Sequence, residues 1–114
     1  MKKLLKSIVL LCTVLSLTFV VSGCGQAKPD YTAKTAESAL NAGKDLEGKT
    51  VKFEVTEYEP ASAFGYNMET GKHLNFVSQD NPKVEKGDTV TVKVKKVTST
   101  MGSFVITYSD LHKD

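Results

Sequence analysis

The sequence predicts a mainly β domain, a small five-stranded antiparallel barrel preceded by one short α-helix. Residues 31–43 carry apolar side chains at steps of three and four, which is typical of a helix. From Val51 onward apolar and polar residues alternate, which is typical of half-buried strands, and glycine or proline stands in the connecting segments. Five short antiparallel strands expose unpaired edges, and curling into a barrel is an economical way to remove them.

The predicted helix has a narrow apolar face. Its small and apolar positions are Ala33, Ala36, Ala39, Leu40 and Gly43. The side chain of Asp30 or Thr32 can cap the amino terminus, and Gly43 is placed to end the helix. A face made almost entirely of alanine buries little area, so the helix is marginal by itself and should dock against the sheet.

Five segments alternate as strands do. They cover residues 51–55, 64–68, 73–78, 90–94 and 104–108. Gly71 is placed for a positive-φ position in the hairpin loop between the second and third strands. The adjacent Lys95 and Lys96 shift the phase of the fourth strand, which predicts a bulge or a strand end. Residues 57–63, 79–88 and 98–103 are expected to be loops or turns.

Residues 1–23 have the layout of a secretory signal peptide. Lysines at positions 2, 3 and 6 precede an uncharged and mostly apolar run, and Ser22 and Gly23 supply small residues at its end. Residues 7–23 number 17, the lower limit for a transmembrane helix, so length alone leaves that alternative open. The lysines before the run and the small residues after it favour export with a cleaved signal.

A cysteine follows this run directly. Cys12 would leave with the signal, so Cys24 would remain unpaired in an oxidising compartment. The residues Val21-Ser22-Gly23-Cys24 resemble the lipobox of bacterial lipoproteins. This resemblance implies cleavage before Cys24 and a diacylglyceryl group, with acyl chains such as palmitate, on the Cys24 sulfur. Two chains hold a protein stably on a bilayer, because each buried CH₂ contributes about 0.8 kcal/mol. The alternative is an ordinary signal peptide with a coincidental cysteine.

The mature chain would be nearly neutral and held close to the cell membrane. The full chain has 15 lysines, no arginine and 13 acidic residues, so loss of three lysines leaves a net charge of −1. This balance lacks the basic character typical of a nucleic-acid binder. Residues 24–30 form the lipidated cysteine and a polar tether of at most about 20–25 Å, which places the domain of residues 31–114 near the bilayer. Lysine-only usage favours a Gram-positive source.

Two segments resemble a known fold family. Residues 84–97, VEKGDTVTVKVKKV, combine an acidic-glycine turn with alternating valines, and residues 46–55, LEGKTVKFEV, are similar to an opening strand. Together they resemble the exported OB-fold lipoproteins called tRNA-anti-like, over most of residues 33–109. The resemblance implies an OB-like barrel. This chain departs from the family in one respect, because the usual helix between the third and fourth strands is missing and the predicted helix precedes the barrel instead. An SH3-like barrel or a small sandwich is also compatible with the pattern.

No pattern in the sequence indicates catalysis or a metal site. His73 and His112 are far apart in the sequence, and no metal-ligand spacing is present. Glu54, Glu57 and Glu59 cluster, but we expect them to be solvated because Glu54 has the parity of an exposed strand face. The sequence shows no nucleophile elbow, ordered triad or glycine-rich phosphate loop. We therefore expect a protein that is not an enzyme and uses no cofactor or metal ion.

Aromatic and amide side chains are the candidate ligand site. OB folds bind ligands across strands two and three, between their first and fourth inter-strand loops, which correspond here to residues 57–63 and 98–103. The resemblance therefore implies a ligand site made of Tyr58, Phe64, Tyr66, Asn67, His73, Asn75 and Phe76. Such side chains suit a sugar, a peptide or another extended chain. The alternative is that the aromatic rings fill a small core, which needs nearly all of them.

These observations favour a monomeric, extracytoplasmic lipoprotein that acts as a binding or adaptor module. Its expected partners are the membrane, through Cys24, and an envelope glycan, a peptide or a membrane protein. A single-stranded oligonucleotide-binding OB domain is one alternative; Lys93, Lys95 and Lys96 form its basic cluster, but the net charge opposes it. Another alternative is that the excised fragment ending in TFVVSG acts as a secreted peptide.

Overall fold

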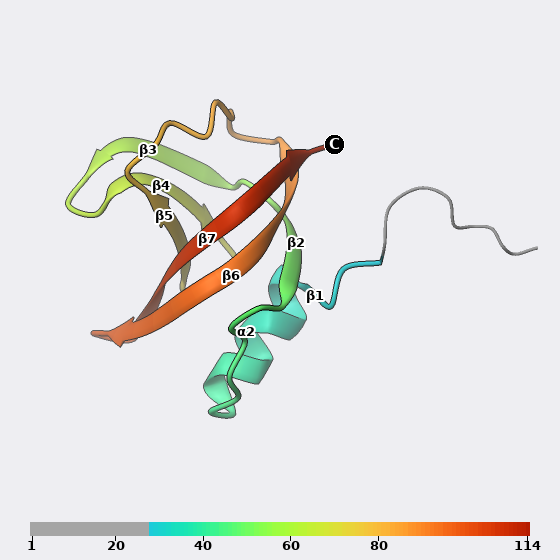
Figure 1. Cartoon of the computed structure of the whole chain (residues 1–114). Coiled ribbons are helices and arrows are strands. Elements are labelled where there is room, and N and C mark those ends of the chain that lie inside the picture. Colours follow the sequence, from blue (N-terminus) through green and yellow to red (C-terminus); the bar gives the residue numbers. More distant parts are fainter. Residues whose placement is uncertain (1–27) are drawn as a thin grey trace, which may run out of the picture.

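The computed structural model describes residues 28–114. The expected signal peptide of residues 1–23, the expected lipidation at Cys24 and the start of the tether lie outside the described residues. The described chain is mainly β with one short helix, as the sequence predicts (Figure 1). None of its helices has the length and apolar character needed to span a bilayer.

All strands of the described chain belong to one sheet. The elements are β1 Tyr31–Thr32, α2 Ala33–Asn41, β2 Thr50–Glu54, β3 Glu57–Ser62, β4 Gly65–Thr70, β5 Leu74–Ser78, β6 Thr89–Thr100 and β7 Ser103–Lys113. The strand order across the sheet is β1-β2-β6-β7-β5-β4-β3.

The expected five-stranded antiparallel barrel is wrong in strand number, direction and closure. The sheet has seven strands, and no ladder joins its two end strands. The β1–β2 and β5–β7 pairs are parallel, whereas the remaining neighbours are antiparallel. The parallel β5–β7 pair arises because residues 79–88 carry the chain across to β6, and β7 then returns beside β5. Alternation along a strand shows which side chains share a face and does not identify the neighbouring strand.

The sheet is strongly curled, because β2 and β3 are neighbours in the chain but far apart in strand order. Only Val55 and Thr56 separate them, so the end of β2 lies within about 10 Å of the start of β3. Hydrogen bonds hold this corner: the Val55 N–H donates to Asp88 O over 2.8 Å, and the Thr56 N–H donates to Glu69 O over 2.9 Å. The curl produces an inner face, which forms the core, and an outer face.

Strand β3 occupies the segment that the sequence predicts as a loop. It lies at the end of the sheet, and most of its residues are exposed. Pro60 interrupts the polar-apolar pattern, and the pairing with β4 shifts register between Glu59 and Ser62. Proline is tolerated in edge strands, where its missing N–H faces outward. Periodicity does not reveal such a strand because neither face is consistently buried.

Helix α2 begins and ends where the sequence predicts its caps, although residues 31–32 form β1 instead of helix. The Thr35 N–H donates to the Thr32 hydroxyl over 3.3 Å, and the Thr32 N–H donates to the Thr35 hydroxyl over 2.9 Å. These reciprocal bonds form a capping box. Gly43, just after the helix, has a φ of +82°, which glycine adopts without the usual steric cost. The buried side chains of α2 include Ala36, Ala39 and Leu40, so the predicted docking is confirmed.

The core lies inside the curl. The rings of Phe53 on β2 and Phe76 on β5 stack with centroids 4.2 Å apart and planes inclined by 15°. Buried valines of β2 and β6, together with Leu46 and Met68, pack around this pair. The stack therefore joins strands from two distant parts of the sheet.

The long β6–β7 hairpin contains the predicted bulge and a turn shorter than expected. Its register shifts between Val94 and Lys96, which confirms the irregularity predicted at Lys95-Lys96. Thr100 pairs with Ser103, so the expected loop of residues 98–103 is reduced to the two-residue turn Met101-Gly102. Residues 98–100 contain no apolar side chain, so apolar-polar alternation does not predict that the strand continues through them.

Candidate groove between two hairpins

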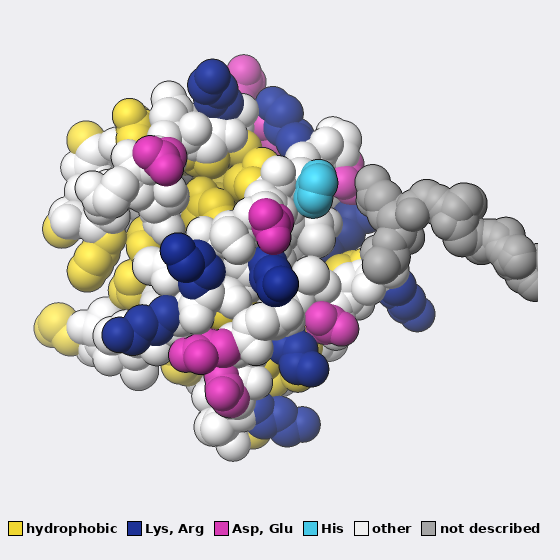
Figure 2. All heavy atoms as spheres, in the orientation of Figure 1, with side chains coloured by type: hydrophobic (Ala, Val, Ile, Leu, Met, Phe, Trp, Pro, Cys, Tyr) yellow, Lys and Arg dark blue, Asp and Glu magenta, His cyan; other side chains and the backbone are white. Residues whose placement is uncertain are grey.

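The β3–β4 and β6–β7 hairpins enclose a groove of about 490 Å³. Both hairpins project to the same side of the molecule (Figure 1), and exposed apolar side chains gather on that side (Figure 2). Strands β5 and β7 contribute Val77, Val105 and Thr107 to the groove. These residues lie on the face opposite their chain neighbours Phe76 and Ile106, which are buried in the core; Thr107 is exposed, Val105 is half-buried and Val77 is only 4% exposed. The volume lies within the range of about 300–1,000 Å³ that is usual for ligand sites.

The groove has an uncharged lining. Its residues are Ala63, Phe64, Val77, Ser78, Gln79, Thr98, Thr100, Val105 and Thr107. A quarter of the whole chain is charged, so a lining without any titratable group distinguishes this surface. Lys96 borders the groove as the cross-strand neighbour of Thr107. The lining offers apolar contacts and neutral hydrogen bonds, and it contains no acid or base for proton transfer.

Phe64 is exposed and yet held in place. Its residue surface is 49% exposed, but its backbone is fixed: the Gln79 side-chain amide donates to Phe64 O over 3.2 Å, and the Phe64 N–H donates to the Ser62 hydroxyl over 3.2 Å. The Ser62 hydroxyl in turn donates to Gly65 O over 2.6 Å. Gly65 approaches β5 so closely that a Cβ there would lie 2.6 Å from Ser78 O. The backbone of the turn is therefore fixed, and the exposed Phe64 lines the groove from it.

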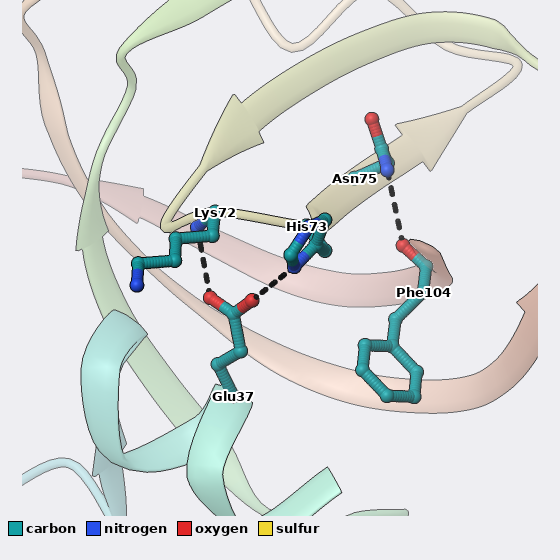
Figure 3. Close-up of polar contacts among 5 residues, drawn as sticks. All are labelled: Glu37, Lys72, His73, Asn75 and Phe104. Atoms are coloured by element: carbon teal, nitrogen blue, oxygen red, sulfur yellow. Dashed lines mark hydrogen bonds and ion pairs between the residues drawn. The ribbon is translucent and has the colours of Figure 1, made fainter. Parts of the chain in front are cut away.

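His73, which the sequence places in the ligand site, contacts helix α2 instead of the groove (Figure 3). Its Nδ1 lies 3.0 Å from Glu37 Oε2, and the Lys72 N–H donates to Glu37 Oε1 over 2.8 Å. The Glu37 side chain is only 11% exposed, whereas that of His73 is 55% exposed. This buried carboxylate ties the β4–β5 turn to the helix. A sequence signal for it exists, because Glu37 lies four residues after Ala33 and three before Leu40, on the predicted apolar face.

Asn67 and Asn75 form a hydrogen-bonded chain across three strands. The Asn67 Nδ2 donates to Asn75 Oδ1 over 3.1 Å, and the Asn75 Nδ2 donates to Phe104 O over 3.3 Å, as Figure 3 shows for the second bond. Asn67 is 8% exposed, and its Oδ1 has no hydrogen-bond partner. The two amides lie opposite Val77 and Val105 in the strand register, next to the groove, but they do not line it.

The remaining predicted ligand residues lie away from the groove. The half-buried Tyr58 donates its hydroxyl to Asn81 Oδ1 over 3.0 Å, and burial, aided by the nearby Tyr66, raises the Tyr58 pKa. Tyr66 is half-buried, and Phe76 is fully buried in the core. Phe64 is therefore the one member of the predicted ligand set that lines the groove.

A smaller, more polar pocket of about 330 Å³ lies beside Tyr108. The Tyr108 hydroxyl oxygen is buried, and no group lies within hydrogen-bonding geometry of it. Burial raises the pKa of Tyr108 to about 12, although the Ser78 hydroxyl is near enough to oppose the shift. The phenol stays neutral near pH 7 and is not a base at that pH.

The sequence reasoning missed the outward-facing residues of the groove, Val77, Val105 and Thr107. The alternation of residues 104–108 places Phe104, Ile106 and Tyr108 on one face of the last strand. The available signal was that Val105 is apolar but out of phase with that face, and that Val77 is apolar directly after Phe76. An apolar residue of the wrong parity indicates a second buried or contacting surface.

Within residues 28–114, no three His, Cys, Asp or Glu side chains are grouped so that they could hold a metal ion. No protein-family model, no curated protein and no solved structure matches this chain.

Proposed function

We propose that this chain is a lipid-anchored, extracytoplasmic binding module without catalytic activity, which holds an uncharged partner in the groove between its two hairpins. The observation that carries the proposal is the uncharged groove with the exposed, hydrogen-bonded Phe64 beside it.

The fixed backbone at Phe64 favours binding. A turn whose backbone is already ordered loses little backbone freedom when a partner covers its exposed aromatic side chain. Aromatic side chains in such positions supply much of the binding energy of protein surfaces. The hydroxyl groups of Ser78 and the threonines can add neutral hydrogen bonds to a peptide or a glycan.

The place of the groove supports an OB-like binding mode. Ala63 and Phe64 follow β3, and Thr98 and Thr100 end β6, so both predicted binding segments contribute to the lining. Only two residues separate β2 from β3, so these strands form one bent segment that brings the ends of the sheet together. This bend supports a likeness to a partly open barrel. The lining contains no lysine, which gives no support to the oligonucleotide alternative.

The direction of the groove is compatible with an anchor at Cys24. The described chain begins on the side of the molecule opposite the hairpin tips (Figure 1). A short tether at that side would leave the groove open to neighbouring components of the envelope. The partner classes that fit are an envelope glycan and a membrane protein.

Metabolic labelling tests the anchor. Cells that produce the full chain and grow on isotope-labelled palmitate should incorporate the label into the processed protein, and Cys24→Ala should prevent incorporation. A processed protein with the mass of its amino acids alone would contradict the anchor.

Titration of the lipidated protein in nanodiscs tests the groove. One arm uses solubilised peptidoglycan glycan strands, and the other uses detergent-solubilised membrane proteins of the same cells. We expect saturable binding in one arm, weakened at least tenfold by Phe64→Ala and unchanged by Lys44→Ala, which alters an exposed side chain outside the groove. The groove proposal is wrong if both variants bind equally well, or if neither arm saturates and the chain does not bind a second copy of itself through this surface.

A further inference from the structure

We infer that the partner which fits this surface is a second copy of the chain, docked hairpin against hairpin on the same membrane. The inference rests on the proposed function, because it names the occupant of the same groove. It replaces the monomer expected from the sequence with a symmetric dimer.

The turn of the β6–β7 hairpin carries an unfavourable residue. Met101 is 100% exposed and has a φ of +49°, and Gly102 follows it with a φ of +84°. A two-residue turn with positive φ at both positions favours asparagine or aspartate before glycine. Both the positive φ of the backbone and the full exposure to water disfavour methionine at this position. Two local penalties at one residue indicate a role outside the isolated fold.

The exposed side chain of Met101 lies next to the apolar part of the groove. Met101 directly follows Thr100, which lines the groove, and the half-buried Val105 supplies apolar surface within it. Phe64 and Met101 are the exposed large apolar side chains of the described residues, and each belongs to one of the two hairpins that enclose the groove. In a two-fold dimer the Met101 side chain of each copy can enter the groove of the other copy, so the same contact forms twice.

The absence of charge suits a contact between identical surfaces. In a two-fold interface each patch meets a copy of itself, and like charges that face each other oppose association. None of the groove residues is charged, so the docked surfaces avoid this cost. Lys96 borders the groove and is placed to remain at the wet rim of the interface.

The membrane anchor favours a second copy over insertion of the hairpins into the bilayer. The hairpin tips lie on the side opposite the start of the described chain (Figure 1), so a short tether from that start to the proposed anchor would leave the tips directed away from the membrane. Copies tethered to one membrane stand at the same height and meet at a raised effective concentration. Sideways contact between hairpins is the geometry that such tethering promotes.

Disulfide trapping tests the dimer. Two differently tagged full-length chains are produced in the same cells, one with Met101→Cys and the other with Thr107→Cys, and the envelope is treated with a mild oxidant. We expect disulfide-linked heterodimers at least fivefold above a control pair of Met101→Cys and Thr91→Cys. Thr91 is a threonine on the same sheet, at the far end of the hairpin, and it does not line the groove. Equal yields from both pairs, or none from either, would overturn the inference.

A second variant separates docking from folding. Met101→Asn suits the turn, so we expect an unfolding temperature equal to or above that of the parent. We also expect a dimer-to-monomer shift, measured by energy transfer between labelled copies of the lipidated protein in the same vesicles. A dimer unchanged by Met101→Asn would contradict the proposed contact.

If the nanodisc titration saturates with glycan strands while trapping fails, the groove function stands and the dimer is wrong. If trapping fails and neither titration saturates, both are wrong.

Discussion

The phenolic oxygen of Tyr108 is buried without a hydrogen-bond partner, although buried tyrosine hydroxyls usually find one. The unpaired Asn67 Oδ1 is a second such atom, on β4 next to the groove. Both contrast with the Glu37 carboxylate, whose two oxygens contact Lys72 and His73. At the scale of single residues, the unpaired oxygens are therefore places where removal of a polar atom should not destabilise the fold.

Tyr108→Phe should change the pH dependence of stability. The folded-state pKa of Tyr108 is about 12, above the ordinary value of 10.0, so the unfolded state loses its proton first as pH rises. The free energy of unfolding of the parent should be unaffected by this group below pH 10 and should fall between about pH 10 and pH 12. In Tyr108→Phe this part of the fall should be absent, and stability at pH 7 should be equal or higher by up to about 1 kcal/mol.

Urea unfolding at several pH values, followed by circular dichroism, measures the difference between the two proteins. An identical decline of both above pH 10 would contradict the assignment to Tyr108.

The contact between α2 and the β4–β5 turn links two elements that are far apart in the chain. Gly71 has a φ of +59°, and a Cβ at this residue would lie 2.5 Å from Glu37 Oε1. Gly43, after the helix, also has a positive φ, but a Cβ there would meet nothing within 4 Å. The two glycines therefore differ in packing while they share a need for a left-handed backbone.

Gly71→Ala should destabilise the protein more than Gly43→Ala. Each substitution pays the backbone cost of about 1–2 kcal/mol. Gly71→Ala also displaces the Glu37 carboxylate and weakens its bond to the Lys72 N–H, which adds about 1–3 kcal/mol. Urea unfolding of the two variants measures this difference. Equal losses would show that the contact between Glu37 and the turn contributes little.

For the molecule as a whole, the curled sheet depends on a core that its distant strands share. The Phe53–Phe76 stack lies between β2 and β5, and Phe76 also approaches Tyr108 on β7, with ring centroids 6.4 Å apart. Phe64, by contrast, lies at a hairpin turn and contributes to the outer surface. Under the proposed function, one fold thus uses aromatic rings for two separate purposes, cohesion inside and contact outside.

Phe76→Ala and Phe64→Ala should separate these purposes. Removal of the buried ring should lower the free energy of unfolding by about 3–5 kcal/mol, whereas removal of the exposed ring should cost less than about 1 kcal/mol. Chemical denaturation measures both losses, and the same samples serve in the binding titration. A loss for Phe64→Ala comparable to that for Phe76→Ala would contradict the division between core and binding surface.

Much of the local structure could be predicted from the sequence. The cap at Thr32, the helix end at Gly43, the positive-φ turn residue Gly71 and the irregularity at Lys95-Lys96 all appear in the structure. Each of these features depends on interactions between residues close in the chain. Strand β3 could not be predicted in this way, because an exposed edge strand with Pro60 has no periodic apolar face.

The amino-acid pattern was sufficient to predict a mainly β domain with one capped helix, and it supports the prediction of an exported, lipid-anchored protein. Long-range packing was needed to establish the mixed strand order, the contact of Glu37 with the β4–β5 turn, and the placement of Phe76 in the core and Phe64 at the groove. The physical reason is that alternation separates two faces of a strand, whereas the packing of residues distant in the chain decides which face is covered.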